Sequence, residues 1–171
     1  GNGAKKTCRI GLDMAVFDYR QAKEIRDAFG RHGARYLFIG KSGAILLGYP
    51  DTTQDADVFA EKSPQNGRAI VAALLELGFA LSETSKSEIE RGKDFVQLKD
   101  GPFDLDLVFA RDGIELFEDA WKRRMGVDGF PVCHIDDIIG SKIAAGRKKD
   151  RESLDRLKSF RNYLMANGGP K

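Results

Sequence analysis

The chain has 171 residues, 42% of them hydrophobic, and a formal net charge of +2, which is normal for one globular domain. No apolar run approaches the roughly 20 residues needed to cross a bilayer, and the N-terminal segment does not resemble a signal peptide. Two cysteines, Cys8 and Cys133, are too few for a disulfide framework. We therefore predict a cytoplasmic domain over residues 1–171, of which 1–17 form an N-terminal extension, with no membrane contact.

The first half of the chain alternates predicted helices and short strands. Apolar residues at helical spacing that end at a glycine predict helices, and short apolar runs bounded by turn residues predict strands. The predicted elements are a helix over 18–32, a strand over 36–39, a helix over 42–47, a strand over 55–60, a helix over 63–78 and a strand beginning at 79–81.

The second half begins with a polar stretch, residues 82–91, which predicts an irregular loop. A hairpin is predicted next, followed by more helices: strands over 94–98 and 103–109, a helix over 114–121, a strand over 127–133 and helices over 135–145 and 151–165. This mixture predicts an α+β (α/β-like) fold with a small mixed sheet flanked by helices. Residues 134–171 would form a C-terminal helical pair.

The charge is unevenly distributed along the chain. Residues 140–171 contain nine basic and three acidic residues, a net charge of +6, so the remainder carries −4. An acidic body beside a basic tail suits a site that holds cations on one side and phosphates on the other. A solvated basic helix would give the same pattern.

Two predicted strands carry carboxylates two residues apart, Asp55 with Asp57 and Asp104 with Asp106. On a strand, residues at this spacing point to the same face. Carboxylates crowded on an apolar surface repel one another and are costly to desolvate, and a hard divalent cation relieves both costs. The pattern therefore predicts a metal site, unless these positions are simply the solvent-facing side of amphipathic strands.

A Gly-rich turn, Gly40-Lys41-Ser42-Gly43, follows the strand over 36–39. A Walker-type phosphate loop needs a glycine five residues before the Gly-Lys pair, and Arg35 stands there instead. Backbone N–H groups where a helix begins can still bind a phosphate. Alternatively, the glycines serve only the dihedral angles of a tight turn.

Together these motifs resemble the minimal nucleotidyltransferases of the DNA polymerase beta type. The resemblance rests on the Gly-rich turn, on Thr53-Gln54-Asp55-Ala56-Asp57, and on a third aspartate on a later strand, and it covers roughly residues 36–157. Residues 134–150 are also similar to a Lys-x4-Arg-x2-Asp segment of the toxin-like (toxin–antitoxin) and antibiotic-modifying branches. Its last position here is Asp150, which could alternatively cap the final helix.

The resemblance implies Mg²⁺-dependent transfer of a nucleoside monophosphate from an NTP, such as ATP, to a hydroxyl group. The acceptor would be an RNA end, a protein or a small molecule. Asp55, Asp57 and Asp106 would be the catalytic metal ligands, with Asp104 as an alternative third ligand, and the third aspartate could accept the proton of the acceptor. The implied nucleotide-binding residues are Gly40, Lys41, Ser42, Thr53, Lys142 and Arg147.

Two positions depart from the superfamily pattern. Lys41 stands where relatives usually have a second glycine or a serine, and Asp51 stands where many have an arginine. Both positions fall at the end of the site that would contact phosphate. They support an alternative prediction, a degenerate and non-catalytic module of the same fold that binds a nucleotide or a partner protein.

Overall fold

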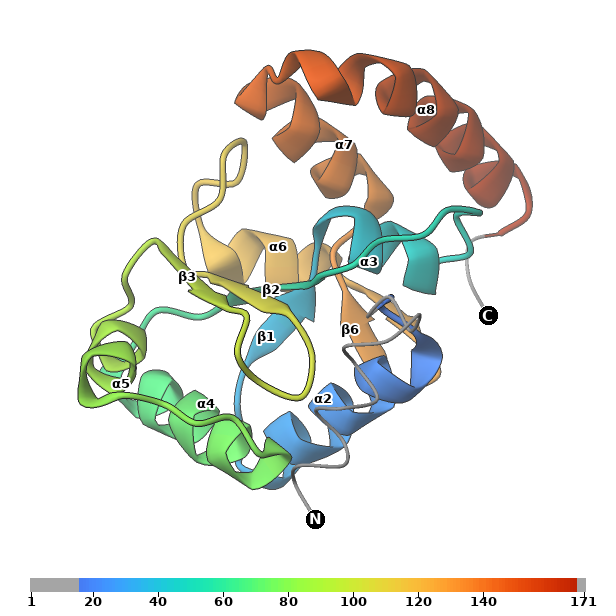
Figure 1. Ribbon diagram of the computed structural model, residues 1–171. Coiled ribbons are helices and arrows are strands. Elements are labelled where there is room, and N and C mark those ends of the chain that lie inside the picture. The colour runs from blue at the N-terminus through green and yellow to red at the C-terminus, as the bar shows by residue number, and fades with distance from the viewer. Residues whose placement is uncertain (1–15, 169–171) are drawn as a thin grey trace.

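The computed structural model describes residues 16–168, so Cys8 and most of the predicted N-terminal extension lie outside the described residues. At its centre is a six-stranded sheet in the order β3-β4-β2-β1-β6-β5 (Figure 1). The β2–β4 and β1–β6 pairs are parallel and the other three pairs are antiparallel, which confirms the predicted mixed sheet. The strands are β1 (Tyr36–Phe38), β2 (Ala56–Ala60), β3 (Phe95–Leu98), β4 (Leu105–Val108), β5 (Met125–Val127) and β6 (Phe130–Val132).

Helices cover both faces of this sheet. Helix α2 packs against α4 and α4 against α5 on one side, while α3 packs against α7 and α7 against α8 on the other (Figure 1). No helix within residues 16–168 has both the length and the apolar character needed to cross a bilayer. The α-helices are α2 (Tyr19–Arg31), α3 (Gly40–Leu46), α4 (Pro64–Leu77), α5 (Glu83–Glu90), α6 (Phe117–Arg123), α7 (Ile135–Ala145) and α8 (Arg151–Ala166).

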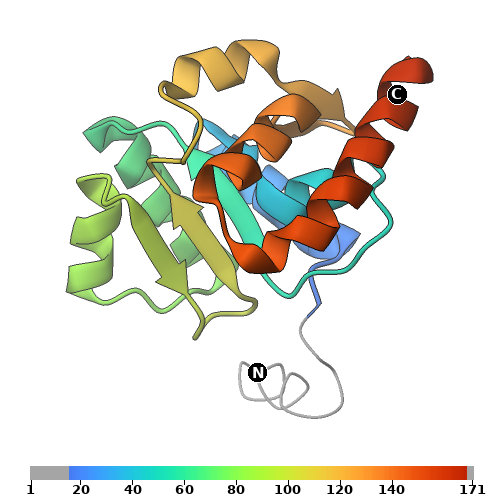
Figure 2. The same cartoon turned by 90° about the horizontal axis from the view of Figure 1, so that it is seen from above.

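The burial of each strand follows its place in the sheet. All four residues of β4 are buried, and β4 lies inside the sheet with β2 on one side and β3 on the other (Figure 2). The edge strand β3 alternates exposed and buried residues, as expected for a strand that packs on the core with one face only. Asp106 therefore lies on a fully buried strand, where a carboxylate needs a specific partner.

Two predictions around residues 79–91 were wrong. Residues 82–91 contain helix α5, which begins where the Ser82 side chain accepts a hydrogen bond from the N–H of Ser85. One buried residue, Ile89, faces the core, so the helix carries almost no apolar periodicity. It is held instead by close packing on α4, where a Cβ on Gly67 would lie 2.6 Å from the Cα of Glu90. Residues 79–81 form no strand, and Phe79 packs edge-on against Phe103.

The single strand predicted over residues 127–133 is a hairpin. Strands β5 and β6 are joined by Asp128 and Gly129, which have φ angles of 51° and 79°. Two consecutive residues with positive φ are typical of the tight Asp-Gly hairpin turn. The Asp-Gly pair was the available signal, and the run of apolar residues around it hid the turn.

Candidate active site

The sheet brings Asp57 and Asp106 together on neighbouring parallel strands. The two residues are register partners in the β2–β4 pair, so their side chains lie on the same face. The two carboxyl groups lie close enough for each to shift the pKa of the other. Only 9% of Asp106 is exposed, so these carboxylates meet in a largely desolvated environment.

Asp55 lies directly before β2, two residues from Asp57. Its negative charge acts on both Asp57 and Asp106, which places all three carboxylates within one electrostatic cluster. One oxygen of Asp55 and one of Asp106, in each case Oδ1, are buried and have no hydrogen-bond partner among residues 16–168. Buried polar atoms are rarely left without a partner, so each of these two oxygens could accept a donor or a cation.

The ionisation of the pair reflects this crowding. Burial, and after it the negative charge of Asp106, raises the pKa of Asp57 to about 7. Burial and the charge of Asp55 raise the pKa of Asp106 as well. The cluster thus carries less negative charge at neutral pH than its residue types suggest, and it would gain charge if a cation entered.

Asp104, the alternative third ligand, occupies a different position. It precedes β4, and its Oδ2 accepts a hydrogen bond from Nε2 of Gln54 at 3.1 Å. Asp106 is the residue that stands opposite Asp57 in the register. The register therefore sets Asp106, rather than Asp104, opposite Asp57.

The Gly-rich turn lies directly against Asp57. Gly40 has a φ angle of 60°, and a Cβ built on it would lie 2.7 Å from Oδ2 of Asp57, so any larger residue would displace the carboxylate. The Ser42 hydroxyl accepts a hydrogen bond from the N–H of Asp57 and donates one to the carbonyl of Ile39, both at 3.0 Å. Ser42 is fully buried, so its hydroxyl fixes the turn to β2.

Lys41 and Asp51, the two departures from the superfamily pattern, contact each other. Nζ of Lys41 lies 3.4 Å from Oδ2 of Asp51. A hydrogen bond from the N–H of Thr52, and then the charge of Lys41, lower the pKa of Asp51 although burial opposes them. Of Thr53, the structure shows that its carbonyl accepts a hydrogen bond from the N–H of Phe17 at 2.8 Å.

Lys142 and Arg147, predicted to contact phosphate, both pair with Asp150. Nζ of Lys142 lies 3.3 Å from Oδ1 of Asp150, and Nε of Arg147 donates to Oδ2 at 2.8 Å. Burial alone would raise the pKa of Asp150, but these two cations hold it below its ordinary value. Asp150 makes no side-chain capping hydrogen bond to α8, so it serves an ion pair instead of a cap.

Arg111 is the residue near the carboxylates that the sequence analysis missed. Its Nε donates to Oγ of the buried Ser141 at 2.8 Å, and its Nη2 lies 3.6 Å from the position of a Cβ on Gly40. Its charge opposes the rise in the pKa of Asp57. A basic residue shortly after the end of the second acidic strand was the available signal.

The donor set suits a hard divalent cation, because the cluster offers only carboxylate oxygens and two of them lack partners. In the part of the chain that the structure describes, no three His, Cys, Asp or Glu side chains stand in an arrangement that could hold a metal ion. Asp55, Asp57 and Asp106 are the residues that would hold a cation, and its positive charge would favour the deprotonated form of the carboxyl groups.

Comparison with known proteins bears on the fold. No family model matches this chain, and no curated protein matches it either. A crystal structure of a Thermotoga maritima protein, described as a putative nucleotidyltransferase, matches with a TM-score of 0.53 and 16% identity. The match covers 83% of this chain and 92% of that one. It shows that the chain shares the fold of that protein, which is consistent with the predicted α+β fold.

Proposed function

We propose that this protein is a Mg²⁺-dependent nucleotidyltransferase that moves a nucleoside monophosphate from an NTP to a hydroxyl acceptor. The observation that carries this proposal is the register pairing of Asp57 with Asp106 beside Gly40. Three carboxylates gathered where a turn brings its backbone close are suited to polyphosphate chemistry, since a site of this kind needs both cations and space for phosphate. The fold of the structural neighbour supports the same class.

Asp55, Asp57 and Asp106 would hold the magnesium ions. When bound, Mg²⁺ would neutralise phosphate charge and make the acceptor hydroxyl more acidic. The unpartnered Oδ1 atoms of Asp55 and Asp106 support this assignment, because a buried carboxylate oxygen without a donor is costly unless a cation meets it.

The other roles fall to groups of this chain around the carboxylates. Asp106 can accept the proton of the acceptor hydroxyl through its free oxygen. The Arg111 guanidinium, oriented by Ser141 and close to Gly40, can contact the phosphates of the NTP. Gly40 has no side chain that would displace the Asp57 carboxylate, so it keeps that carboxylate beside the turn.

We assign Lys142 and Arg147 to the support of the site. Lys142 is only 6% exposed and is paired with Asp150, so contact with a phosphate would leave Asp150 with a single cation. Their ion pairs join the end of α7 to the start of α8. In this role they hold the C-terminal helices in place beside α3.

A non-catalytic binding module remains the second candidate, favoured by the Lys41–Asp51 ion pair at the phosphate-contacting end. Incubation with labelled NTPs, Mg²⁺ and total RNA, followed by analysis of RNA and protein fractions, separates the two candidates. We expect label to appear in an acceptor with the unaltered protein and not with Asp57→Asn. Asp119→Asn, an exposed residue on α6, is the matched control. Absence of transfer to every acceptor, with NTP binding intact, would establish the binding module.

A further inference from the structure

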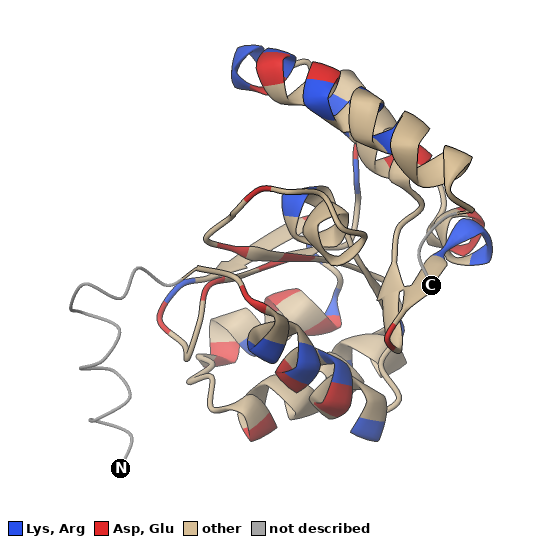
Figure 3. Ribbon diagram, turned by 90° about the vertical axis from the view of Figure 1, so that its right-hand side faces the viewer, with Lys and Arg blue, Asp and Glu red and all other residues tan. Residues whose placement is uncertain are grey.

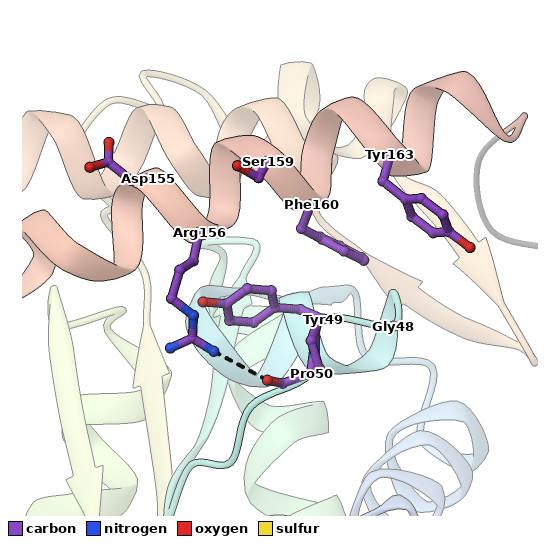
Figure 4. A pocket seen from close by; sticks show the side chains of 8 residues that line it. All are labelled: Gly48, Tyr49, Pro50, Asp155, Arg156, Ser159, Phe160 and Tyr163. Atoms are coloured by element: carbon purple, nitrogen blue, oxygen red, sulfur yellow. Dashed lines mark hydrogen bonds between the residues drawn. The ribbon is translucent and has the colours of Figure 1, made fainter.

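A second site lies between α8 and the segment that connects α3 to β2 (Figure 4). This cavity has a volume of about 620 Å³, which falls within the range of small-molecule sites. We call it the tyrosine pocket. It is lined by Gly48, Tyr49, Pro50, Asp155, Arg156, Ser159, Phe160 and Tyr163.

One face of α8 supplies most of the pocket. Arg156, Phe160 and Tyr163 recur at helical spacing, so they share a face of α8. Figure 4 shows Arg156 directed toward Pro50 and the Tyr163 ring at the other end of the pocket. The Phe160 ring meets the buried Tyr49 ring edge-on, with centroids 5.6 Å apart. Tyr163 is 65% exposed, so a large part of its ring surface is open to a ligand.

The polar groups of the pocket are placed beside these rings. The Arg156 guanidinium lies 5.4 Å from the centroid of the Tyr49 ring, and its Nη2 donates to the carbonyl of Pro50 at 3.3 Å. Tyr49 is only 3% exposed, and its hydroxyl oxygen has no partner among residues 16–168. A buried hydroxyl without a partner is costly, so this oxygen would gain from a donor or acceptor brought near it.

The pocket also adjoins the candidate active site. Nη1 of Arg156 lies 3.9 Å from Oδ2 of Asp51, and the same oxygen lies 3.4 Å from Nζ of Lys41. Lys41 directly follows Gly40, where an added Cβ would lie 2.7 Å from Oδ2 of Asp57. The C-terminal helices carry both basic and acidic residues (Figure 3), with the basic ones in excess. A ligand in the pocket could extend toward the carboxylates past Arg156 and Lys41.

We propose that the tyrosine pocket binds a nucleobase of a single-stranded RNA whose end is the acceptor of the transfer. This inference rests on the proposed function and specifies its acceptor. Open aromatic rings stack on bases of any sequence, and a nearby guanidinium contacts the phosphate or the base plane. The exposed Tyr163 ring would stack on the base, and Arg156 would contact the adjoining phosphate.

Fluorescence anisotropy with a labelled single-stranded RNA, in EDTA and at fixed salt, tests the pocket without the transfer reaction. We expect Tyr163→Ala and Arg156→Ala to raise the Kd at least about fivefold, the lower end of what loss of one stacked base causes. The matched controls are Tyr19→Ala, since Tyr19 is 51% exposed at the start of α2, and Arg151→Ala on the exposed surface of α8. Both controls should stay within about twofold of the unaltered protein.

An abasic oligonucleotide of equal length keeps the phosphates and removes the bases. We expect it to bind at least about fivefold more weakly than the RNA. Equal binding of the two, or equal losses for Arg156→Ala and Arg151→Ala, would overturn the proposal. A protein that transfers nucleotides to another acceptor but binds no RNA would also overturn it and leave the proposed function standing. Base-dependent RNA binding without any transfer would support the pocket as an RNA site and overturn the proposed transferase activity.

Discussion

Lys41 and Asp51 form an ion pair of 3.4 Å, although each was set apart in the sequence only as a departure from the superfamily pattern. The two departures are therefore linked by a direct contact: the lysine in the Gly-rich turn pairs with the aspartate in the segment that faces it. Because Asp51 pairs with Lys41, less positive charge is available at the phosphate-contacting end of the site. The same Asp51 oxygen also lies 3.9 Å from Nη1 of Arg156.

The pair should affect NTP binding more than stability. The Lys41 side chain is 34% exposed, and pairs of this kind contribute about 0–1 kcal/mol. We expect Asp51→Asn to release Lys41 toward the phosphates and to lower the KM for the NTP, and Lys41→Ala to raise it. Steady-state kinetics of both single variants and the double variant give the coupling. If Asp51→Asn raises the KM instead, Lys41 does not contact the NTP.

Asp57→Asn should abolish transfer while leaving the metal-free protein as stable as before, or more stable. The amide is a poorer ligand for a hard cation, but the substitution removes one charge from a crowded and buried cluster. Thermal melts in EDTA and in excess Mg²⁺ provide the measurement. The unaltered protein should melt higher with Mg²⁺, because the ion binds the native state. Asp57→Asn should lose most of that gain; an unchanged gain would place the ion elsewhere.

The stability of the metal-free protein should fall as pH rises from about 4 toward 7. Folding raises the pKa of Asp57 from 3.8 to about 7, so in this window the folded state binds more protons than the unfolded state. Stability is then greatest at the acidic end and is lost as the pH approaches the folded pKa. Urea midpoints in EDTA at several pH values measure the slope. Asp57→Asn should flatten it, and an equal slope in that variant would assign the effect to other groups.

Arg111→Gln should lower kcat/KM for transfer roughly tenfold or more, since hydrogen bonds to charged groups contribute about 1.5–3 kcal/mol. The variant removes the charge near Gly40 and keeps a side chain that can reach Ser141. Ser141→Ala should have a smaller effect, because it alters only the orientation of Arg111. Arg151→Gln serves as the control. Equal activity of Arg111→Gln and the control would restrict Arg111 to a structural role.

Lys142→Met should act mainly on stability. It leaves the buried Asp150 with Arg147 as its remaining cation, and loss of one partner from a buried pair costs about 3–5 kcal/mol. The retained contact should keep the loss near the lower end. Denaturant unfolding is the measurement, with Lys158→Met as a control on the exposed side of α8. Adding Asp150→Asn should recover most of the loss; failure to recover would mean that Lys142 acts through another contact.

The parts of the site that followed from sequence are those with a short repeating pattern. Carboxylates at alternate positions in apolar runs placed Asp57 and Asp106 on strand faces, and parallel pairing of β2 with β4 set them opposite each other. The choice between Asp104 and Asp106 depended on the register, which no local pattern specifies. The partners of Lys142 and Arg111 depended on contacts between distant segments, and a lysine or arginine has the same appearance in sequence whether it is paired or free.

The fold shows the same division. Helix α5 has almost no apolar periodicity, because it rests on α4 through the backbone contact at Gly67 and through the buried Ile89. Its Ser82 cap was a local signal, but a cap without an apolar stripe also occurs in loops. The β5–β6 hairpin is the opposite case. Its Asp-Gly pair is a local signal for a turn, but the apolar residues on either side favoured the prediction of one continuous strand.

Ser42 limits where the specificity of this protein can change. Its hydroxyl accepts a hydrogen bond from the N–H of Asp57 and donates one to the carbonyl of Ile39, so it joins the Gly-rich turn to the acidic strand. A larger or apolar residue at this position would disturb the carboxylate before it altered any contact with a ligand. Attempts to redirect the protein toward another substrate should therefore start from α8 and its connecting segment, where exposed residues can be exchanged without moving the reactive groups.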